Sequence, residues 1–240
     1  AAISSDQRRR KAIWELLTEA GRSSLVVAWW ATWPAEPILG TMISNRAIPW
    51  GDFEAVTLDA LGREDRLSHP PNVQSLVLDL TRDVVRGRDA TSLDRDNALF
   101  FDVRDEIALE AFLRRGDDVD LRTVYLQGVD TRSHAWTANV YGGNSARVRP
   151  MLVSEAEAQR RFQAMVVAGY ERMDAMLARI VETLRPDEGL LIVSDHGWQY
   201  DGTAHWNRPD GTLLAWGGPF RSGARIARAT VFDILPTLCT

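Results

Sequence analysis

Short apolar runs without polar alternation are spaced along the chain between segments of helical periodicity. Continuous runs of β-prone residues are typical of strands that are buried on both faces of a parallel sheet. Polar residues or glycines bound each run and keep it to the length of a strand. The pattern predicts strands over residues 24–30, 123–127, 190–193 and 212–216.

The first helix is predicted ahead of the first strand. Ser5 or Asp6 is placed to cap it, and Gly21 is placed to stop it, because glycine readily takes the backbone conformation that ends a helix. Its apolar positions recur at helical spacing and are Ile13, Trp14, Leu16, Leu17 and Ala20.

Further helices are predicted between the later strands. Residues 73–85 are amphipathic, and so are residues 105–115 ahead of Gly116. The longest helix is predicted to begin at a capping box formed by Ser154 and Glu157 and to end before Pro186.

This alternation predicts an α/β fold, with a largely parallel sheet that helices flank on both faces. We interpret residues 1–240 as a single domain. Residues from about 45 to 105 form the most irregular stretch, which we interpret as an insertion or a cap over the sheet edge. Ligands of such sheets bind beyond the carboxyl ends of the strands.

Composition narrows the classes of function. The net charge of -5 argues against a broad nucleic-acid-binding surface, which needs clustered cations. The one basic cluster, residues 8–11, is interpreted as a solvated face. No apolar run approaches the length of a membrane span, and the first residues lack a signal-peptide pattern, so the sequence leaves the compartment open.

Cysteine usage limits the choice of metal ligands. Cys239 is the single cysteine, which excludes a multi-cysteine zinc or iron–sulfur site. Any bound metal must therefore be held by histidines and carboxylates. Of the 4 histidines, His69 precedes two prolines in the irregular stretch and is interpreted as structural or incidental.

The other histidines follow predicted strand ends and stand near carboxylates. Asp130 and His134 come after the strand at 123–127, while Asp195 and His196 directly follow the strand at 190–193. His205 lies in the loop before the last strand. Taken singly, these are also typical of a surface turn, a helix cap or a loop histidine. Together they offer the oxygen and nitrogen ligands that a zinc-type dication needs in the absence of thiolates.

These residues stand within a larger set of motifs. The set comprises Leu126 to Asp130 with His134, Ile192 to Gly197, His205, and Pro209-Asp-Gly followed by an apolar strand and Gly217-Gly-Pro. It resembles, in the same order, the metal-binding half of the type I phosphodiesterase/nucleotide pyrophosphatase family of the alkaline phosphatase superfamily. Residues 29–36 and 233–237 resemble further signatures of bacterial members.

The resemblance implies a metal-dependent hydrolase of phosphodiesters or phosphomonoesters that acts on a small phosphorylated substrate. It implies two divalent ions, zinc or alternatively manganese. Asp130, His134 and His205 would hold one ion, and Asp195 with His196 would supply part of the shell of the second. In the family, two metals clamp the phosphoryl group during an in-line displacement that passes through a covalent phosphoenzyme.

The family completes its second site with an aspartate and a Ser or Thr nucleophile, both upstream of the region that this chain resembles. No Ser or Thr here matches that motif, so no catalytic nucleophile is assigned, and the chain alone is expected to be inactive. Trp29, Trp30 and Trp33 end the first strand, where they either pack in the core or stack on a flat leaving group.

Two other classes remain open from the sequence. A sulfatase or a metal-dependent phosphosugar mutase of the same superfamily would share these metal ligands and differ in the nucleophile region. The non-enzymatic alternative is a metal-binding or interaction domain.

Overall fold

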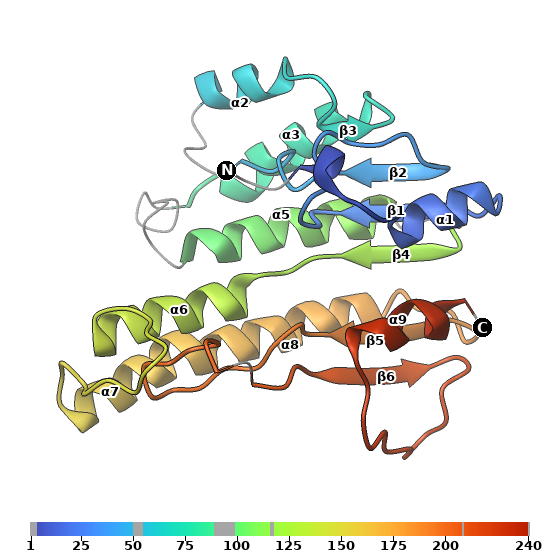
Figure 1. The fold of residues 1–240 in the computed structure, drawn as a ribbon. Coiled ribbons are helices and arrows are strands. Elements are labelled where there is room, and N and C mark those ends of the chain that lie inside the picture. The colour runs from blue at the N-terminus through green and yellow to red at the C-terminus, as the bar shows by residue number, and fades with distance from the viewer. Residues whose placement is uncertain (1–3, 50–54, 89–98, 116–117, 208, 240) are drawn as a thin grey trace. The chain divides into compact units, whose positions relative to one another are not determined.

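The computed structural model describes residues 4–49, 55–88, 99–115, 118–207 and 209–239 (Figure 1). The chain divides into two compact units, residues 1–128 and 129–240. Each unit is described by itself. Among the described helices, none is long and apolar enough to cross a membrane.

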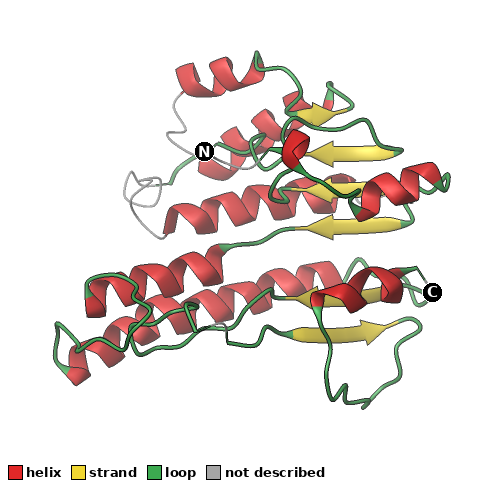
Figure 2. Cartoon of the chain, viewed as in Figure 1, coloured by secondary structure: helices red, strands yellow, loops and turns green. Residues whose placement is uncertain are grey.

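The first unit is built on a four-stranded sheet of order β3-β2-β1-β4 (Figure 2). β1 pairs in parallel with β2 and with β4, and the short β3 pairs antiparallel with β2. Its elements are η1 (Ser5–Gln7), α1 (Ile13–Glu19), β1 (Ser24–Val27), β2 (Gly40–Ile43), α2 (Ala55–Gly62), β3 (Ser68–His69), α3 (Val73–Val85), α5 (Leu99–Arg115) and β4 (Leu121–Val124).

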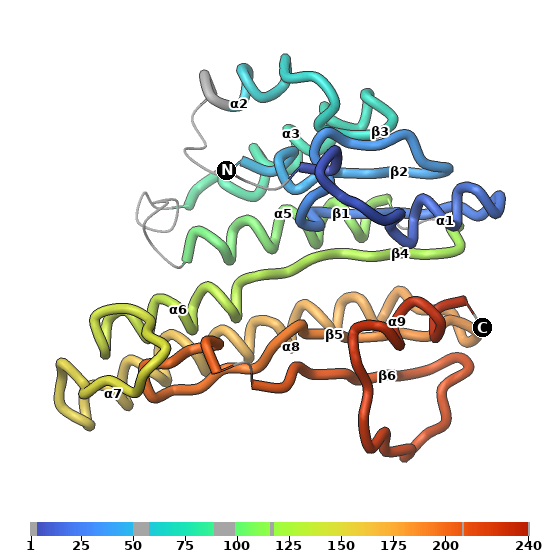
Figure 3. The backbone as a smooth tube through the Cα atoms, viewed as in Figure 1, coloured from blue at the N-terminus to red at the C-terminus, as the bar shows by residue number. Residues whose placement is uncertain are grey.

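The second unit pairs the strands β5 and β6 antiparallel. Helix α6 begins at the unit boundary, and α7, η2 and α8 follow one another without a break (Figure 3). Its elements are α6 (Gly128–Tyr141), α7 (Glu155–Phe162), the π-helical η2 (Gln163–Val167), α8 (Ala168–Val181), β5 (Gly189–Val193), β6 (Leu213–Gly217) and α9 (Val231–Leu238).

The mixed α/β class with a mostly parallel central sheet confirms the expected fold. Helix α3 has the predicted bounds, and Gly21 ends α1 with a φ of 72°. The predicted cap of α1 is wrong, because Ala12 stands at the N-cap and Ser5 belongs to η1. Ser154 does accept a hydrogen bond from the Glu157 amide, at 3.3 Å.

Burial agrees with the prediction at β1 and differs at β5 and β6. Leu25, Val26 and Val27 have no exposed surface, as expected of a central strand. In the two-stranded sheet, by contrast, Leu214 and Trp216 are more than half exposed. An apolar run predicts a strand, but the number of layers that cover it depends on residues far away in the sequence.

The sequence did not predict β2, which lies just before the irregular stretch, or the short β3, which lies within it. The prediction of an insertion or cap falls partly on residues 50–54 and 89–98, which lie outside the described residues, as does Gly116. The single-domain interpretation and the cap remain predictions. His69 lies in β3, opposite Met42.

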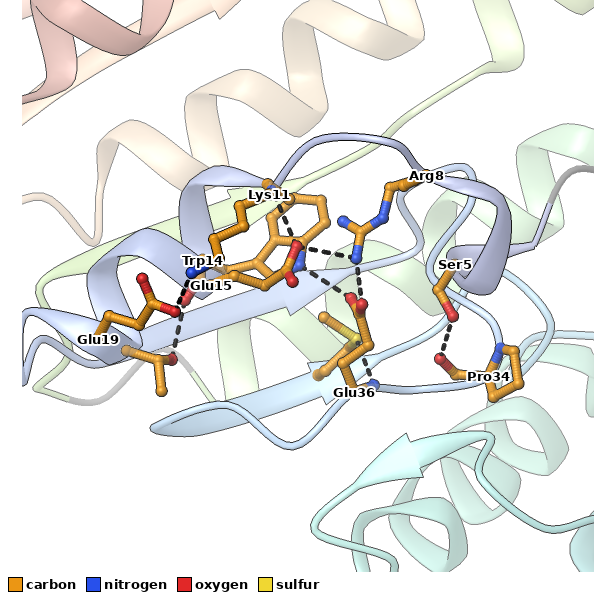
Figure 4. A network of polar contacts seen from close by, with 11 residues as sticks. Ser5, Arg8, Lys11, Trp14, Glu15, Glu19, Pro34 and Glu36 are labelled. Carbon is orange, nitrogen blue, oxygen red and sulfur yellow. Dashed lines mark hydrogen bonds and ion pairs between the residues drawn. The ribbon is translucent and has the colours of Figure 1, made fainter.

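A polar network ties the N-terminal segment to the sheet (Figure 4). Arg8 forms ion pairs with Glu15, at 3.1 Å, and with Glu36, and its side chain is only 17% exposed. The indole N–H of Trp14 donates to Glu36 at 3.3 Å. The interpretation of the basic cluster as a solvated face is therefore wrong for Arg8, which bridges α1 and the segment before β2.

The tryptophans that follow β1 differ in their surroundings. Trp29 packs against the core cluster that contains Trp14 and Val26. Trp30 is 46% exposed and lies edge-on to Tyr125. Trp29 thus takes the packing role that large aromatic residues usually have.

Candidate metal centre

All five predicted metal ligands lie in the second unit. Asp130 and His134 stand one turn apart on α6, so their side chains share a helix face. Asp195 and His196 follow the end of β5, and His205 lies in the loop before β6. Asp130 and His134 thus lie on the first turns of a helix, and the other three residues lie in the loops between β5 and β6.

Asp130 stands at the centre of this group. Its Oδ1 atom lies 3.7 Å from His134 Nε2 and 3.9 Å from His196 Nε2. The Asp195 carboxylate lies 3.9 Å from the same His196 nitrogen, although its side chain is 85% exposed. Three of these side chains thus converge on one point, and Asp195 approaches it from the solvent side.

His205 completes the cluster. Its ring centroid lies 4.5 Å from that of His196 and 5.1 Å from that of His134. The chain reverses between these histidines at an isolated bridge of Gln199 with Ala204, where the Gln199 amide donates to the Ala204 carbonyl at 3.0 Å. This reversal, and not the spacing along the sequence, brings His205 beside His196.

The reversal is held by its own polar contacts. The Thr203 hydroxyl donates to Asp201 Oδ1 and lies 3.0 Å from Gln199 Oε1, and the Thr203 amide donates to Asp201 Oδ1 at 3.0 Å. Asp201 is thus a turn residue, and these contacts hold its pKa below the ordinary value, with the hydrogen bond from the Thr203 hydroxyl as the largest cause.

The tautomer of His196 follows from its hydrogen bond. Its Nδ1 atom lies 3.0 Å from the carbonyl oxygen of Gly197. A carbonyl can only accept, so Nδ1 carries the proton and the neutral ring presents a lone pair at Nε2. That lone pair faces the carboxylates of Asp130 and Asp195 at 3.9 Å each, an arrangement that a cation between them would stabilise.

Position 197 leaves no room for a side chain. A Cβ atom at this position would lie 2.5 Å from the carbonyl oxygen of Asp210, closer than real contacts allow. The Gly197 amide also donates to the Pro209 carbonyl at 3.0 Å. The close approach of the backbone at residues 209–210 therefore requires glycine after His196.

Electrostatics keep His134 neutral. Burial is the largest cause that lowers its pKa below the ordinary value, and the neighbouring His205 and His196 lower it further, while Asp130 opposes them. A neutral imidazole is the form that binds metals. Trp198 packs edge-on to His134 at 4.4 Å and shields this side of the cluster.

A dication needs closely spaced donor atoms. As the side chains lie, no group of three or more His, Cys, Asp or Glu within the described ranges has an arrangement that could hold a metal ion. Ligand atoms around a tetrahedral zinc lie roughly 3.3 Å apart, given bonds of about 2.0 Å. The distances of 3.7 and 3.9 Å around Asp130 are slightly wider.

The chemistry of the group nevertheless fits a cation. Oδ1 of Asp130 is buried and has no hydrogen-bond partner, although the side chain as a whole is 38% exposed. A buried carboxylate oxygen without a partner is unfavourable, and a cation held between it and the imidazoles would relieve it. The residues present therefore fit a metal in donor type and in charge.

Comparison with known proteins identifies the family of the chain. A sequence profile of the type I phosphodiesterase / nucleotide pyrophosphatase family matches residues 4–203. The chain belongs to this family. Membership places it among the phosphodiesterase- and pyrophosphatase-type hydrolases of the alkaline phosphatase superfamily. No curated protein and no solved structure matched the chain.

The match to the phosphodiesterase family covers four of the five candidate ligands. His205 lies just beyond the matched range of 4–203, so its place in the cluster rests on its contacts with His196 and His134.

Sequence reasoning missed two neighbours of the cluster. Trp198 directly follows the Asp195-His196-Gly197 motif, and this position in the sequence could have indicated that it lies near the cluster. Asn144, whose amide contacts His134, has no spacing that marks it.

Proposed function

We propose that this chain carries the metal-binding part of a metal-dependent phosphoric ester hydrolase. Asp130, His134 and His205 are the ligands of the first divalent ion, and Asp195 with His196 contributes to a second. When bound, two such ions polarise a phosphoryl group and favour attack at phosphorus. Zinc suits nitrogen and oxygen donors in the absence of thiolates, and manganese is the alternative.

The single observation that carries this proposal is the buried Oδ1 of Asp130, which has no hydrogen-bond partner and faces two imidazole nitrogens. The chain supplies binding and orientation: α6 fixes Asp130 relative to His134, and the Gly197 carbonyl fixes the His196 ring. Positive charge at the cluster would also let a protein of net charge -5 bind an anionic ester.

No residue of the chain is proposed as the nucleophile, since no Ser or Thr matches the motif of the family. The substrate is proposed only as a small phosphate ester. Whether it is a monoester or a diester depends on a pocket that the cluster alone does not define.

A zinc titration with single-ligand variants tests the proposal. We expect His134→Ala and His205→Ala each to lose affinity strongly, because a site with few protein ligands depends on every one. His69→Ala is the matched control, since His69 lies in β3 of the first unit. If both ligand variants bound zinc with the affinity and stoichiometry of the control, the assignment of the first site would be wrong.

A further inference from the structure

Asn144 reaches His134 from a turn that follows α6. Gly142 begins this turn with a φ of 71°, a conformation that glycine adopts without strain. The Ser145 amide then donates to the Gly202 carbonyl at 3.0 Å, which ties the turn to the loop that carries His205. The segment is therefore held in place although the Asn144 side chain is exposed.

The contact is made on the side of the imidazole that faces away from the cluster. Asn144 Nδ2 lies 2.7 Å from His134 Nδ1, while His134 Nε2 faces Asp130 Oδ1 at 3.7 Å. Histidines that bind metals usually have their second nitrogen hydrogen-bonded to a neighbouring polar group, which fixes the ring and its tautomer. Asn144 occupies that position for His134.

A primary amide differs from other such partners because it can serve either tautomer. Its NH₂ group can donate to an unprotonated Nδ1, and after the side chain turns over its carbonyl oxygen can accept from Nδ1–H. The Gly197 carbonyl beside His196 allows only the second arrangement. The tautomer of His196 is thus fixed, with the lone pair at Nε2, whereas His134 can adopt either tautomer.

We propose that Asn144 is a positioning residue that sets the tautomer of His134 and turns its amide over when a metal binds. Without metal, the amide NH₂ donates to Nδ1 and the Nε2 proton points at the buried Asp130 Oδ1. With metal, the amide carbonyl accepts from Nδ1–H and the Nε2 lone pair points into the cluster. The metal-bound half of this inference rests on the proposed metal site.

Three variants of the full chain test the proposal. Asn144→Ala removes the partner, and Asn144→Asp replaces the amide with a group that only accepts. Asn139→Ala is the matched control. Asn139 is exposed and lies on α6, the helix that carries His134, but its side-chain amide donates to the Ala135 carbonyl at 2.8 Å. Histidine ring ¹⁵N–¹H correlation spectra report the tautomer, and competition with a chelator reports the zinc affinity.

In metal-free protein we expect His134 to be protonated on Nε2 in the wild type and on Nδ1 in Asn144→Asp. On addition of zinc, the wild-type ring should convert to the Nδ1–H form. Asn144→Ala should bind zinc about 10-fold more weakly, the lower end of the effect of losing such a partner because the amide is exposed. Asn139→Ala should behave as the wild type in both measurements.

Two results would overturn the proposal: a His134 tautomer that Asn144→Asp leaves unchanged, or a zinc affinity of Asn144→Ala equal to that of Asn139→Ala. A third result separates this inference from the proposed function. If Asn144→Asp moves the proton but zinc leaves the His134 signals unchanged, the metal site is refuted and Asn144 remains the residue that sets the tautomer.

Discussion

Replacing Asp105 by Asn should change the pH dependence of stability of the first unit. Asp105 is buried on α5 and accepts two backbone hydrogen bonds, Oδ1 from the Gln127 amide at 2.9 Å and Oδ2 from the Gly128 amide at 2.7 Å. Burial raises its pKa from 3.8 to about 7, against the effect of these hydrogen bonds. The substitution removes one acceptor and the titration together.

The first consequence is independent of pH, and the second changes with pH. Asn offers a single acceptor oxygen, so one amide N–H faces the new NH₂ group, which costs about 1–3 kcal/mol at any pH. Because the folded-state pKa is raised, the wild-type carboxyl contributes stability that is fully present below pH 3.8 and is lost as the pH rises through about 7. At 1.36 kcal/mol per pKa unit, the loss between about pH 5 and about pH 8 is roughly 3 kcal/mol.

The deficit of Asp105→Asn should therefore fall by roughly 3 kcal/mol between about pH 5 and about pH 8, so that near pH 8 the variant is as stable as the wild type or more stable. Native-state hydrogen exchange of the β1 amides measures the free energy of unfolding of this unit. Asp79→Asn is the control, because Asp79 is 70% exposed and pairs with Arg82 on the surface of α3. Its deficit should be small.

A deficit of Asp105→Asn that is the same at both pH values would refute the raised pKa. A deficit that grows toward pH 8 would mean that the ionised carboxylate is the stabilising form. The second result would show that the hydrogen bonds from Gln127 and Gly128 outweigh burial.

Three further expectations concern the cluster. Gly197→Ala should weaken zinc binding about 10-fold or more in a chelator competition. The alanine Cβ would lie 2.5 Å from the Asp210 carbonyl oxygen and would displace His196. An unchanged zinc affinity would show that the backbone accommodates the Cβ. A second zinc equivalent should bind more weakly than the first in calorimetry, and Asp195→Asn should affect only that weaker phase, since Asp195 is 85% exposed; two equally tight ions would contradict this. The zinc-loaded chain should neither turn over aryl phosphate mono- or diesters robustly nor form a covalent phosphoenzyme, and a phosphorylated Ser or Thr found by mass spectrometry would identify a nucleophile that sequence reasoning missed.

Helices with a clear polar and apolar face were predictable from the sequence. Residues 73–85 form α3 with the expected bounds, and Ser154 caps α7 as its spacing from Glu157 indicated. These features depend on residues within a turn or two of each other. The π-helical η2 interrupts the predicted long helix, and no pattern along 163–167 marks it.

The strands of the two sheets, and how far they are buried, were harder to predict from the sequence. β2 was missed because Gly40–Ile43 is short and begins with a glycine, whereas its burial comes from pairing with β1. The runs that form β5 and β6 were predicted to be buried, yet Leu214 and Trp216 are more than half exposed. Apolar composition selects the strand conformation, while burial depends on which segments pack against it.

For the candidate site, the sequence by itself determined the types of ligand, their order and the absence of a cysteine-rich alternative. The tertiary structure decided which of them meet. The Gln199–Ala204 reversal sets His205 against His196, and the turn after α6 sets Asn144 against His134. Helical periodicity and short motifs follow from residue types along the chain, whereas these contacts depend on the backbone reversal at Gln199 and Ala204 and on the hydrogen bond from Ser145 to the distant Gly202, which residue spacing does not encode.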